Sequence, residues 1–179
     1  QFDPKQFPLS QWRQCSRQAL EVKAVDRWWQ EGENVGESQL IDQLIRRVLP
    51  RRGIAATHDQ VLLTLGRQQS FYLLARLFAR PGSVIGVEEP GYRDPRNAFA
   101  HDGAQVLPLP VDEQGLQISP ALAQCDYLYC TPAYQCPTGV TMSQARRLAL
   151  LEHAQRHDQV LFEDDDDPET EYDGHALPA

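Results

Sequence analysis

The sequence predicts an α/β fold in which a mostly parallel β-sheet is flanked by helices. Short apolar runs rich in Val, Leu and Ile have the length of buried strands and recur along the chain. Amphipathic stretches of helical period lie between most of these runs. This alternation favours parallel pairing, because the chain must cross back over the sheet before each parallel strand begins. At 179 residues, the chain is long enough for one domain with a sizeable core.

Five apolar runs are predicted to form strands. In chain order they are VLLTL (61–65), SVIGVEE (83–89), AQVLPLPV (104–111), DYLYCTP (126–132) and QVLFEDD (159–165). Turn-forming residues border several of them, as in RPGS, EEPGY and HDGA. This punctuation indicates tight turns within one domain and not a linker between two domains.

Three stretches, residues 37–53, 67–80 and 143–157, are predicted to form helices with one apolar face each. Ser143 is expected to cap the start of the last helix, and the first helix should end near Pro50. The residues expected to face inward are Leu40, Leu44, Ile45 and Val48 in the first helix, Phe71, Leu74, Leu77 and Phe78 in the second, and Leu148, Leu151 and Ala154 in the third.

Composition excludes several classes of function. Asp and Glu outnumber Lys and Arg by 25 to 17, and the formal charge of −8 leaves no basic stripe with which the chain could grip DNA by itself. No apolar run reaches the length of a membrane span, and we expect a soluble, cytoplasmic protein.

The four cysteines lack the paired C-x-x-C spacing of a zinc site and are expected to be reduced. His153 and His157, at i and i+4 on a helix, are expected to face solvent.

Loops that follow the predicted strands are the candidates for a ligand site, since open parallel sheets bind ligands beyond the carboxyl ends of their strands. TLGRQQS (64–70) opens a helix, where backbone amides and the side chains of Arg67 and Gln68 could receive a phosphate. Alternatively, Gly66 could serve only a tight turn. TPAYQCPTGV (131–140) is the second candidate loop, and neither a Walker pattern nor a G-x-G-x-x-G pattern occurs.

The third candidate, LFEDDDDPETEYDG (161–174), places five carboxylates in a row behind an apolar pair. It is not an EF-hand, because counting from Asp164 puts Glu169 where Gly is required and His175 where Glu is required. Asp164 and Asp166 could hold Mg²⁺. A carboxylate at the strand end could instead pair with a protonated ring nitrogen of a cofactor, as pyridoxal phosphate demands. The remaining interpretation is a solvated loop.

Five segments in order along nearly the whole chain carry a resemblance to a known family. They are FPLSQW, LTLGRQQSFYLLARL, VEEPGY, TPAYQCPTGVTMSQARRLALLEHA and FEDDDDPETEYDGHALPA. Together they resemble the aminotransferase-like domain of MocR-type transcriptional regulators of the GntR family. The resemblance implies part of the large domain of a fold type I pyridoxal-phosphate-dependent aminotransferase, with an N-terminal segment at 1–36 and the α/β portion at 37–179.

The resemblance also implies roles for residues of the candidate loops. Gly66, Arg67 and Gln68 would lie in the phosphate cup. Tyr92 would stack on the pyridine ring, and Gln135 would lie beside the ring. Asp164 would face the ring nitrogen and keep it protonated, so that the ring withdraws electrons. The residues implicated in cofactor binding are Gly66, Arg67, Gln68, Tyr92, Gln135, Asp164 and Asp166.

Two departures from the family pattern bear on the cofactor's phenolic oxygen. Asp166 replaces a Tyr whose hydroxyl would reach that oxygen, and Cys136 stands where related enzymes carry an Asn with the same task. A carboxylate repels an anionic oxygen unless the carboxylate is protonated. We therefore expect a weakened or remodelled cofactor site.

The function implied by the resemblance is sensing by a homodimer. Pyridoxal phosphate, an amino-acid-like or vitamin effector, or both would control DNA binding by a winged helix outside this chain. A pyridoxal-phosphate-dependent class I/II aminotransferase and a cofactor-free dimerisation domain remain as alternatives. No catalytic residue is assigned, because the family's cofactor-binding lysine follows the acidic strand and the lysines here, Lys5 and Lys23, precede it. Two family strands and the C-terminal small domain are also expected outside this chain, which would leave VLLTL without its usual sheet neighbours.

Overall fold

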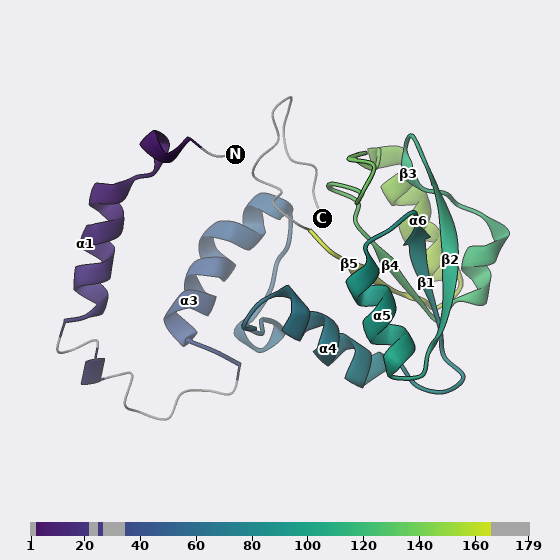
Figure 1. The fold of residues 1–179 in the computed structure, drawn as a ribbon, viewed down its shortest axis with the longest axis horizontal. Coiled ribbons are helices and arrows are strands. Elements are labelled where there is room, and N and C mark those ends of the chain that lie inside the picture. The colour runs from purple at the N-terminus through teal and green to yellow at the C-terminus, as the bar shows by residue number, and fades with distance from the viewer. Residues whose placement is uncertain (1–2, 22–24, 27–34, 166–179) are drawn as a thin grey trace.

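The computed structural model describes residues 3–21, 25–26 and 35–165, and its centre is a five-stranded sheet. β1 pairs in parallel with β2 and β4, and β4 pairs in parallel with β5, whereas the short β3 is antiparallel to β2. The prediction of a mostly parallel sheet is confirmed. In the sheet order β3-β2-β1-β4-β5 (Figure 1), the strands are β3 (Gly115–Leu116), β2 (Gln105–Asp112), β1 (Val84–Glu89), β4 (Tyr127–Cys130) and β5 (Val160–Glu163).

The prediction of a strand at residues 61–65 is wrong. This segment has no regular secondary structure and pairs with no strand of the described sheet. Leu63 N donates instead to Val35 O (2.8 Å), and the Leu65 side chain is 97% exposed. A strand is stabilised by ladder hydrogen bonds and cross-strand side-chain contacts, so an apolar run without a neighbouring strand does not form one.

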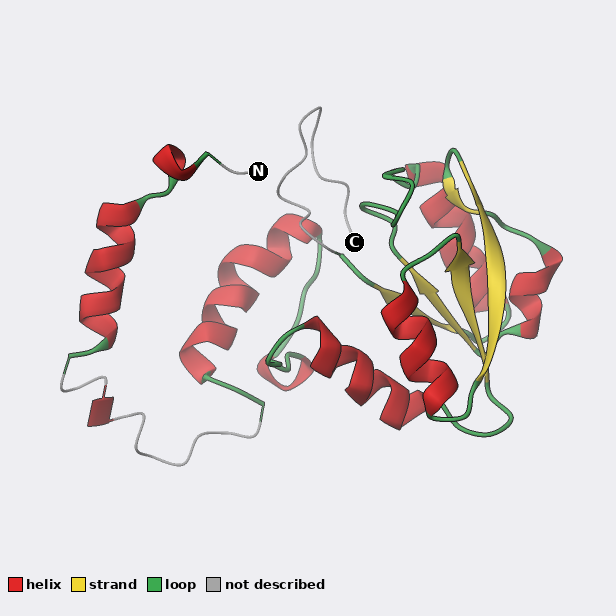
Figure 2. Ribbon diagram, in the orientation of Figure 1, coloured by secondary structure: helices red, strands yellow, loops and turns green. Residues whose placement is uncertain are grey.

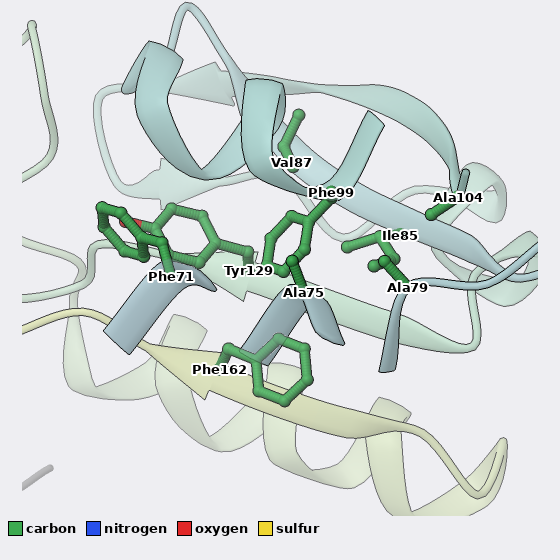
Figure 3. Packing of buried hydrophobic residues seen from close by; sticks show 9 residues of the cluster. All are labelled: Phe71, Ala75, Ala79, Ile85, Val87, Phe99, Ala104, Tyr129 and Phe162. Carbon is green, nitrogen blue, oxygen red and sulfur yellow. The ribbon is translucent and has the colours of Figure 1, made fainter. Parts of the chain in front are cut away.

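Helices cover both faces of the sheet (Figure 2). α4 (Arg67–Phe78) and α5 (Arg93–His101) pack on one face. Leu77, which was expected to face inward, is 73% exposed, and Ala75 takes the buried position on α4. The buried cluster between these helices and the sheet (Figure 3) consists of Phe71, Ala75, Ala79, Ile85, Val87, Phe99, Ala104, Tyr129 and Phe162.

The other face of the sheet is covered by α6 (Gln144–Arg156) and the 3-10 helix η5 (Pro120–Gln124). Side chains alternate between the two faces along each strand, so Leu128 lies in this second cluster while Tyr129 lies in the first. A Cβ atom at Gly86 would lie 2.5 Å from Leu109 Cδ1, and this close approach requires glycine. The second cluster consists of Leu109, Leu116, Leu122, Cys125, Leu128, Cys130, Met142 and Leu150.

The start of α6 was predicted correctly, but of the residues expected on its buried face only Ala154 is buried. Ser143 accepts a hydrogen bond from Arg146 N (3.3 Å) and caps the helix as expected. Leu148 and Leu151 are exposed, whereas the buried positions are Leu150, His153 and Ala154. Apolar residues occur almost all round this helix, so their spacing predicts a helix without fixing which side meets the sheet.

The segments that precede α4 are short helices. α1 has no buried residue and lies apart from the sheet (Figure 1). The predicted helix at 37–53 is divided into α-helical, π-helical and 3-10 parts, and its fully buried residue is Ile41, while Leu40 is exposed. No helix in the described ranges is long and apolar enough to cross a bilayer. In chain order the segments are η1 (Pro4–Gln6), α1 (Leu9–Ala19), α3 (Ser38–Gln43), η2 (Leu44–Val48), η3 (Leu49–Arg52) and η4 (His58–Gln60).

A buried carboxylate fastens the end of β4 to β1. Glu88 is only 3% exposed and accepts hydrogen bonds from Thr131 N (3.2 Å), Thr131 Oγ1 (2.6 Å) and Gln135 Nε2 (3.2 Å). Burial raises the pKa of the Glu88 carboxyl, and these hydrogen bonds oppose that shift. The loop that leaves β4 is thereby held against the neighbouring strand.

Replacement of Glu88 tests this connection. In Glu88→Ala, the buried donors of Thr131 and Gln135 lose their acceptor, and the free energy of unfolding should fall by about 1–3 kcal/mol. Glu89→Ala is the matched control, because Glu89 lies next in sequence with a half-exposed side chain paired with Arg96, and it should cost less than about 1 kcal/mol. Urea unfolding of the full-length polypeptide measures both values. Equal costs would show that the Glu88 network does not stabilise the fold.

The expectation that His153 faces solvent is wrong, and its burial predicts a pH effect. His153 is 7% exposed, its Nε2 has no hydrogen-bond partner among the described residues, and its ring centroid lies 4.3 Å from that of His157. Burial, reinforced by His157, lowers the pKa of His153 from its usual 6.5.

The unfolded chain therefore binds a proton at His153 in a pH range where the folded chain does not. The free energy of unfolding should fall as pH decreases from about 6.5 toward the lowered pKa of the folded state. His153→Leu should flatten this slope in urea unfolding measured at several pH values. His101→Leu, a control at an exposed position, should retain it. A slope unchanged by His153→Leu would contradict the assignment.

Candidate functional site

The carboxyl ends of β1, β4 and β5 meet at one edge of the sheet, and the N-terminus of α4 approaches the same edge. Asp164 directly follows β5, and its amide donates to Cys130 O at the end of β4 (3.0 Å). The Tyr129 hydroxyl donates to Asp164 Oδ2 (2.6 Å). The sheet register therefore places Asp164, the predicted partner of the ring nitrogen, beside the loops that follow the neighbouring strands.

The beginning of α4 has the geometry of an anion site. Gly66 has a φ of +138°, and a Cβ atom built there meets no atom within 4 Å. The first amides of a helix point away from its body and lack partners within the helix, so they attract negative charge. Leu65 N donates to Gln69 Oε1 (2.6 Å), and the Thr64 and Ser70 hydroxyls lie 3.0 Å apart, which holds the turn in place.

Arg67 connects the helix start to the other predicted site residues. Its guanidinium carbon lies 4.7 Å from the centroid of the Tyr92 ring, and its Nη1 lies 3.9 Å from Asp164 Oδ2. Gln68 Nε2 donates to Asp94 Oδ2, which also accepts from the Tyr92 hydroxyl (2.7 Å). The structure therefore brings Arg67, Gln68, Tyr92 and Asp164 together as the sequence predicts.

Tyr129 stays protonated and serves as the donor to Asp164. Burial, followed by its contact with Asp164, raises the pKa of the Tyr129 hydroxyl. The Tyr129 ring makes edge contacts with Phe71 and Phe99, at centroid distances of 6.0 and 6.2 Å. A packed aromatic ring therefore determines where the Asp164 carboxylate lies.

The side chain of Gln135 is occupied within its own loop. Gln135 is 1% exposed; its Nε2 donates to Pro90 O (2.8 Å) and Cys136 O (2.8 Å) as well as to Glu88, and its Oε1 accepts from Thr138 Oγ1 (2.5 Å). These bonds connect the loops that follow β1 and β4. Asp166, the remaining predicted site residue, lies outside the described residues.

Each described carboxylate of the acidic run contacts a different arginine. Glu163 Oε1 lies 3.7 Å from Arg147 Nη1 of α6, and Asp164 lies near Arg67 of α4. Asp165 forms an ion pair with Arg52, which is 8% exposed and belongs to η3. Burial raises the pKa of the carboxyls of Glu163 and Asp165, and the adjacent arginines oppose that rise. The start of the run is thus a set of paired charges and not only a solvated loop.

The sequence did not indicate that Glu88, Asp94, Tyr129 and Arg52 lie at this site. One signal was present for Glu88, because an acidic residue inside an apolar strand must find partners when the strand is buried. The contacts of Tyr129 and Arg52 bridge 35 and 113 positions of sequence, respectively, and no local pattern reveals them. Among the residues that the structure describes, no group of three or more His, Cys, Asp or Glu side chains could hold a metal ion.

The chain is similar to transcription regulators over its whole length. It is 35% identical to the HTH-type transcriptional regulator TauR of Rhodobacter capsulatus, covering 100% of this chain and 37% of that protein. It is 30% identical to the probable rhizopine catabolism regulatory protein MocR of Rhizobium meliloti, covering 98% of this chain and 36% of that protein. The chain therefore spans little more than a third of these relatives. No protein-family model matches it.

Aminotransferases share both sequence and fold with the chain. The kynurenine aminotransferase of Pyrococcus horikoshii has a TM-score of 0.84 and 30% identity, covering 98% of this chain and 45% of that chain. The multiple substrate aminotransferase of Thermococcus profundus has a TM-score of 0.86 and 29% identity, covering 98% and 46%. The described sheet and helices are thus part of a fold type I aminotransferase large domain. Together with the regulator relatives, this makes the chain similar to the aminotransferase-like domain of MocR-type transcription regulators.

Proposed function

We propose that this chain is part of the ligand-sensing domain of a transcription regulator. The observation that carries the proposal is the convergence of the α4 N-terminus, Tyr92 and Asp164 at one sheet edge, in a chain that is similar to regulators over its whole length. The sensed ligand is pyridoxal phosphate, an amino-acid-like or vitamin effector, or both in turn. The acidic charge of the chain argues against DNA binding by the chain itself, and the similarity to HTH-type regulators supports DNA binding by a winged helix elsewhere in the polypeptide.

The residues at this edge fit pyridoxal phosphate by their chemistry. The open turn at Gly66 and the first amides of α4 suit a phosphate, the Tyr92 ring offers an aromatic face, and Asp164 offers a carboxylate. Gln68 is fixed near the helix start by Asp94. When bound, the cofactor supplies an aldehyde that combines with amines and a ring that withdraws electrons.

Asp164 has the central part in this proposal. Its carboxylate would hold a proton on the ring nitrogen, and the Tyr129 hydroxyl and the backbone bond to Cys130 keep it in position. Because Tyr129 donates its only hydroxyl hydrogen to Asp164, the carboxylate is oriented without being neutralised. The Glu88 network holds the loop of Cys136 on the neighbouring strands.

Occupancy would be transmitted to DNA through a homodimer, and such a protein would act in the cytoplasm. The similarity to an HTH-type transcriptional regulator supports the DNA-binding part of this proposal. The competing function is a true aminotransferase. It is favoured by 29% identity to aromatic-amino-acid aminotransferase 1 of Thermococcus litoralis, which covers 97% of this chain and 44% of that protein. The two functions differ in whether ligand binding changes DNA affinity or leads to turnover.

Visible absorbance of the full-length gene product separates these functions. With added pyridoxal phosphate, we expect an absorbance band that borohydride abolishes, and mass spectrometry should locate the modified lysine beyond the described residues. Binding to DNA fragments from upstream of the gene should change with the cofactor. Transamination of amino acids without DNA binding would favour the aminotransferase. No band from a folded protein would contradict cofactor binding.

Asp164→Asn tests the ring-nitrogen contact. The amide cannot keep the ring nitrogen protonated, and the loss of a charge-assisted hydrogen bond should weaken pyridoxal-phosphate binding by roughly tenfold or more, about 1.5–3 kcal/mol. Asp158→Asn is the control, since Asp158 is exposed and its φ of +53° suits Asn equally well. Equilibrium dialysis gives both affinities. Equal binding by the two variants would remove Asp164 from the site.

A further inference from the structure

We propose that the Arg67 side chain takes the place of the cofactor ring and competes with it for Tyr92 and Asp164. This inference rests on the proposed function, since it concerns the same site. The inference goes beyond the proposed function, because it assigns to this chain a positively charged side chain that competes with the cofactor. Cofactor binding would then require Arg67 to move.

The contacts of Arg67 define the overlap. The guanidinium lies over the Tyr92 ring at 4.7 Å from its centroid, the position expected of a group that stacks on that ring. The same guanidinium lies 3.9 Å from Asp164 Oδ2, the oxygen that also accepts from Tyr129. A pyridinium ring that stacks on Tyr92 and pairs with Asp164 needs the same two partners.

Guanidinium and pyridinium groups are alike in the features that matter here. Both are planar and cationic, and both carry N–H donors in their plane. Arg67 stays charged at any physiological pH, so it satisfies Asp164 and covers the Tyr92 face whenever the ring is absent. Without a ligand, the Arg67 side chain therefore makes the contacts with Tyr92 and Asp164 that the cofactor ring would make.

The Arg67 side chain is partly exposed and lies outside the buried cluster. Its side chain is 40% exposed and belongs to the first residue of α4. The buried cluster beneath it is built from Phe71, Tyr129 and their neighbours, and it does not include Arg67. A ligand must displace at least the cation–π contact and the side-chain hydrogen bond of Arg67 with Tyr92, and its partly exposed ion pair with Asp164, which corresponds to roughly fivefold or more in affinity.

Two ligands distinguish competition for the ring from attraction of the phosphate. Pyridoxal phosphate has both groups, whereas pyridoxine has the ring but no phosphate. Equilibrium dialysis of both ligands would be performed on the full-length polypeptide as wild type, Arg67→Ala and Arg67→Gln. Arg76→Ala is the matched control, since Arg76 lies on the same helix, is 62% exposed and pairs with Asp102 at 3.2 Å.

Both Arg67 variants should bind pyridoxine about fivefold more tightly than wild type. Arg76→Ala should bind both ligands like wild type. Unchanged pyridoxine affinity combined with weaker pyridoxal-phosphate binding in the Arg67 variants would overturn the inference and assign Arg67 to the phosphate. If wild type binds the ligands and neither Arg67 variant binds pyridoxine more tightly, the inference is overturned while the proposed function remains intact. Failure of every protein to bind either ligand would overturn the cofactor proposal and this inference together.

Discussion

Parallel pairing of β4 between β1 and β5 is the constraint on which the candidate site depends. Parallel neighbours end at the same edge, so residues separated by up to 76 positions, such as Glu88 and Asp164, are brought into electrostatic contact there. Tyr129 makes the link between layers, because its ring packs under α4 and α5 while its hydroxyl holds Asp164. Core packing and site geometry are therefore determined by the same strand.

The carboxylates buried at this edge are stabilised by partners from several elements. Removing a carboxylate from water is costly unless hydrogen bonds or an opposite charge replace the lost solvation. Glu88 relies on neutral donors from one loop, whereas Glu163, Asp164 and Asp165 each face an arginine from a separate helical segment. The acidic run thus has a structural use, since it joins η3, α4 and α6 to the end of β5.

The same arrangement separates carboxylates with a structural role from the one that we propose to bind a ligand. Asp165 is paired with a buried arginine, and Glu88 is surrounded by its donors, so neither is available to a ligand. Asp164 faces an arginine that is 40% exposed and lies on an aromatic ring. A partly exposed partner beside a carboxylate that is held in place suits the proposed binding site, because the site stays ordered without a ligand.

The sequence by itself determined four of the five strands of the described sheet, the helix α4 and the Ser143 cap of α6, because these follow from local period and motif. Tertiary structure decided the rest. Leu148 and Leu151 satisfy the helical period, yet Leu150 and His153 are buried, since the phase of a helix depends on what it packs against. Residues 61–65 have the composition of a strand but no strand beside them. The partners of Arg52, Arg67 and Tyr129 are distant in sequence, so only the folded sheet could assign them.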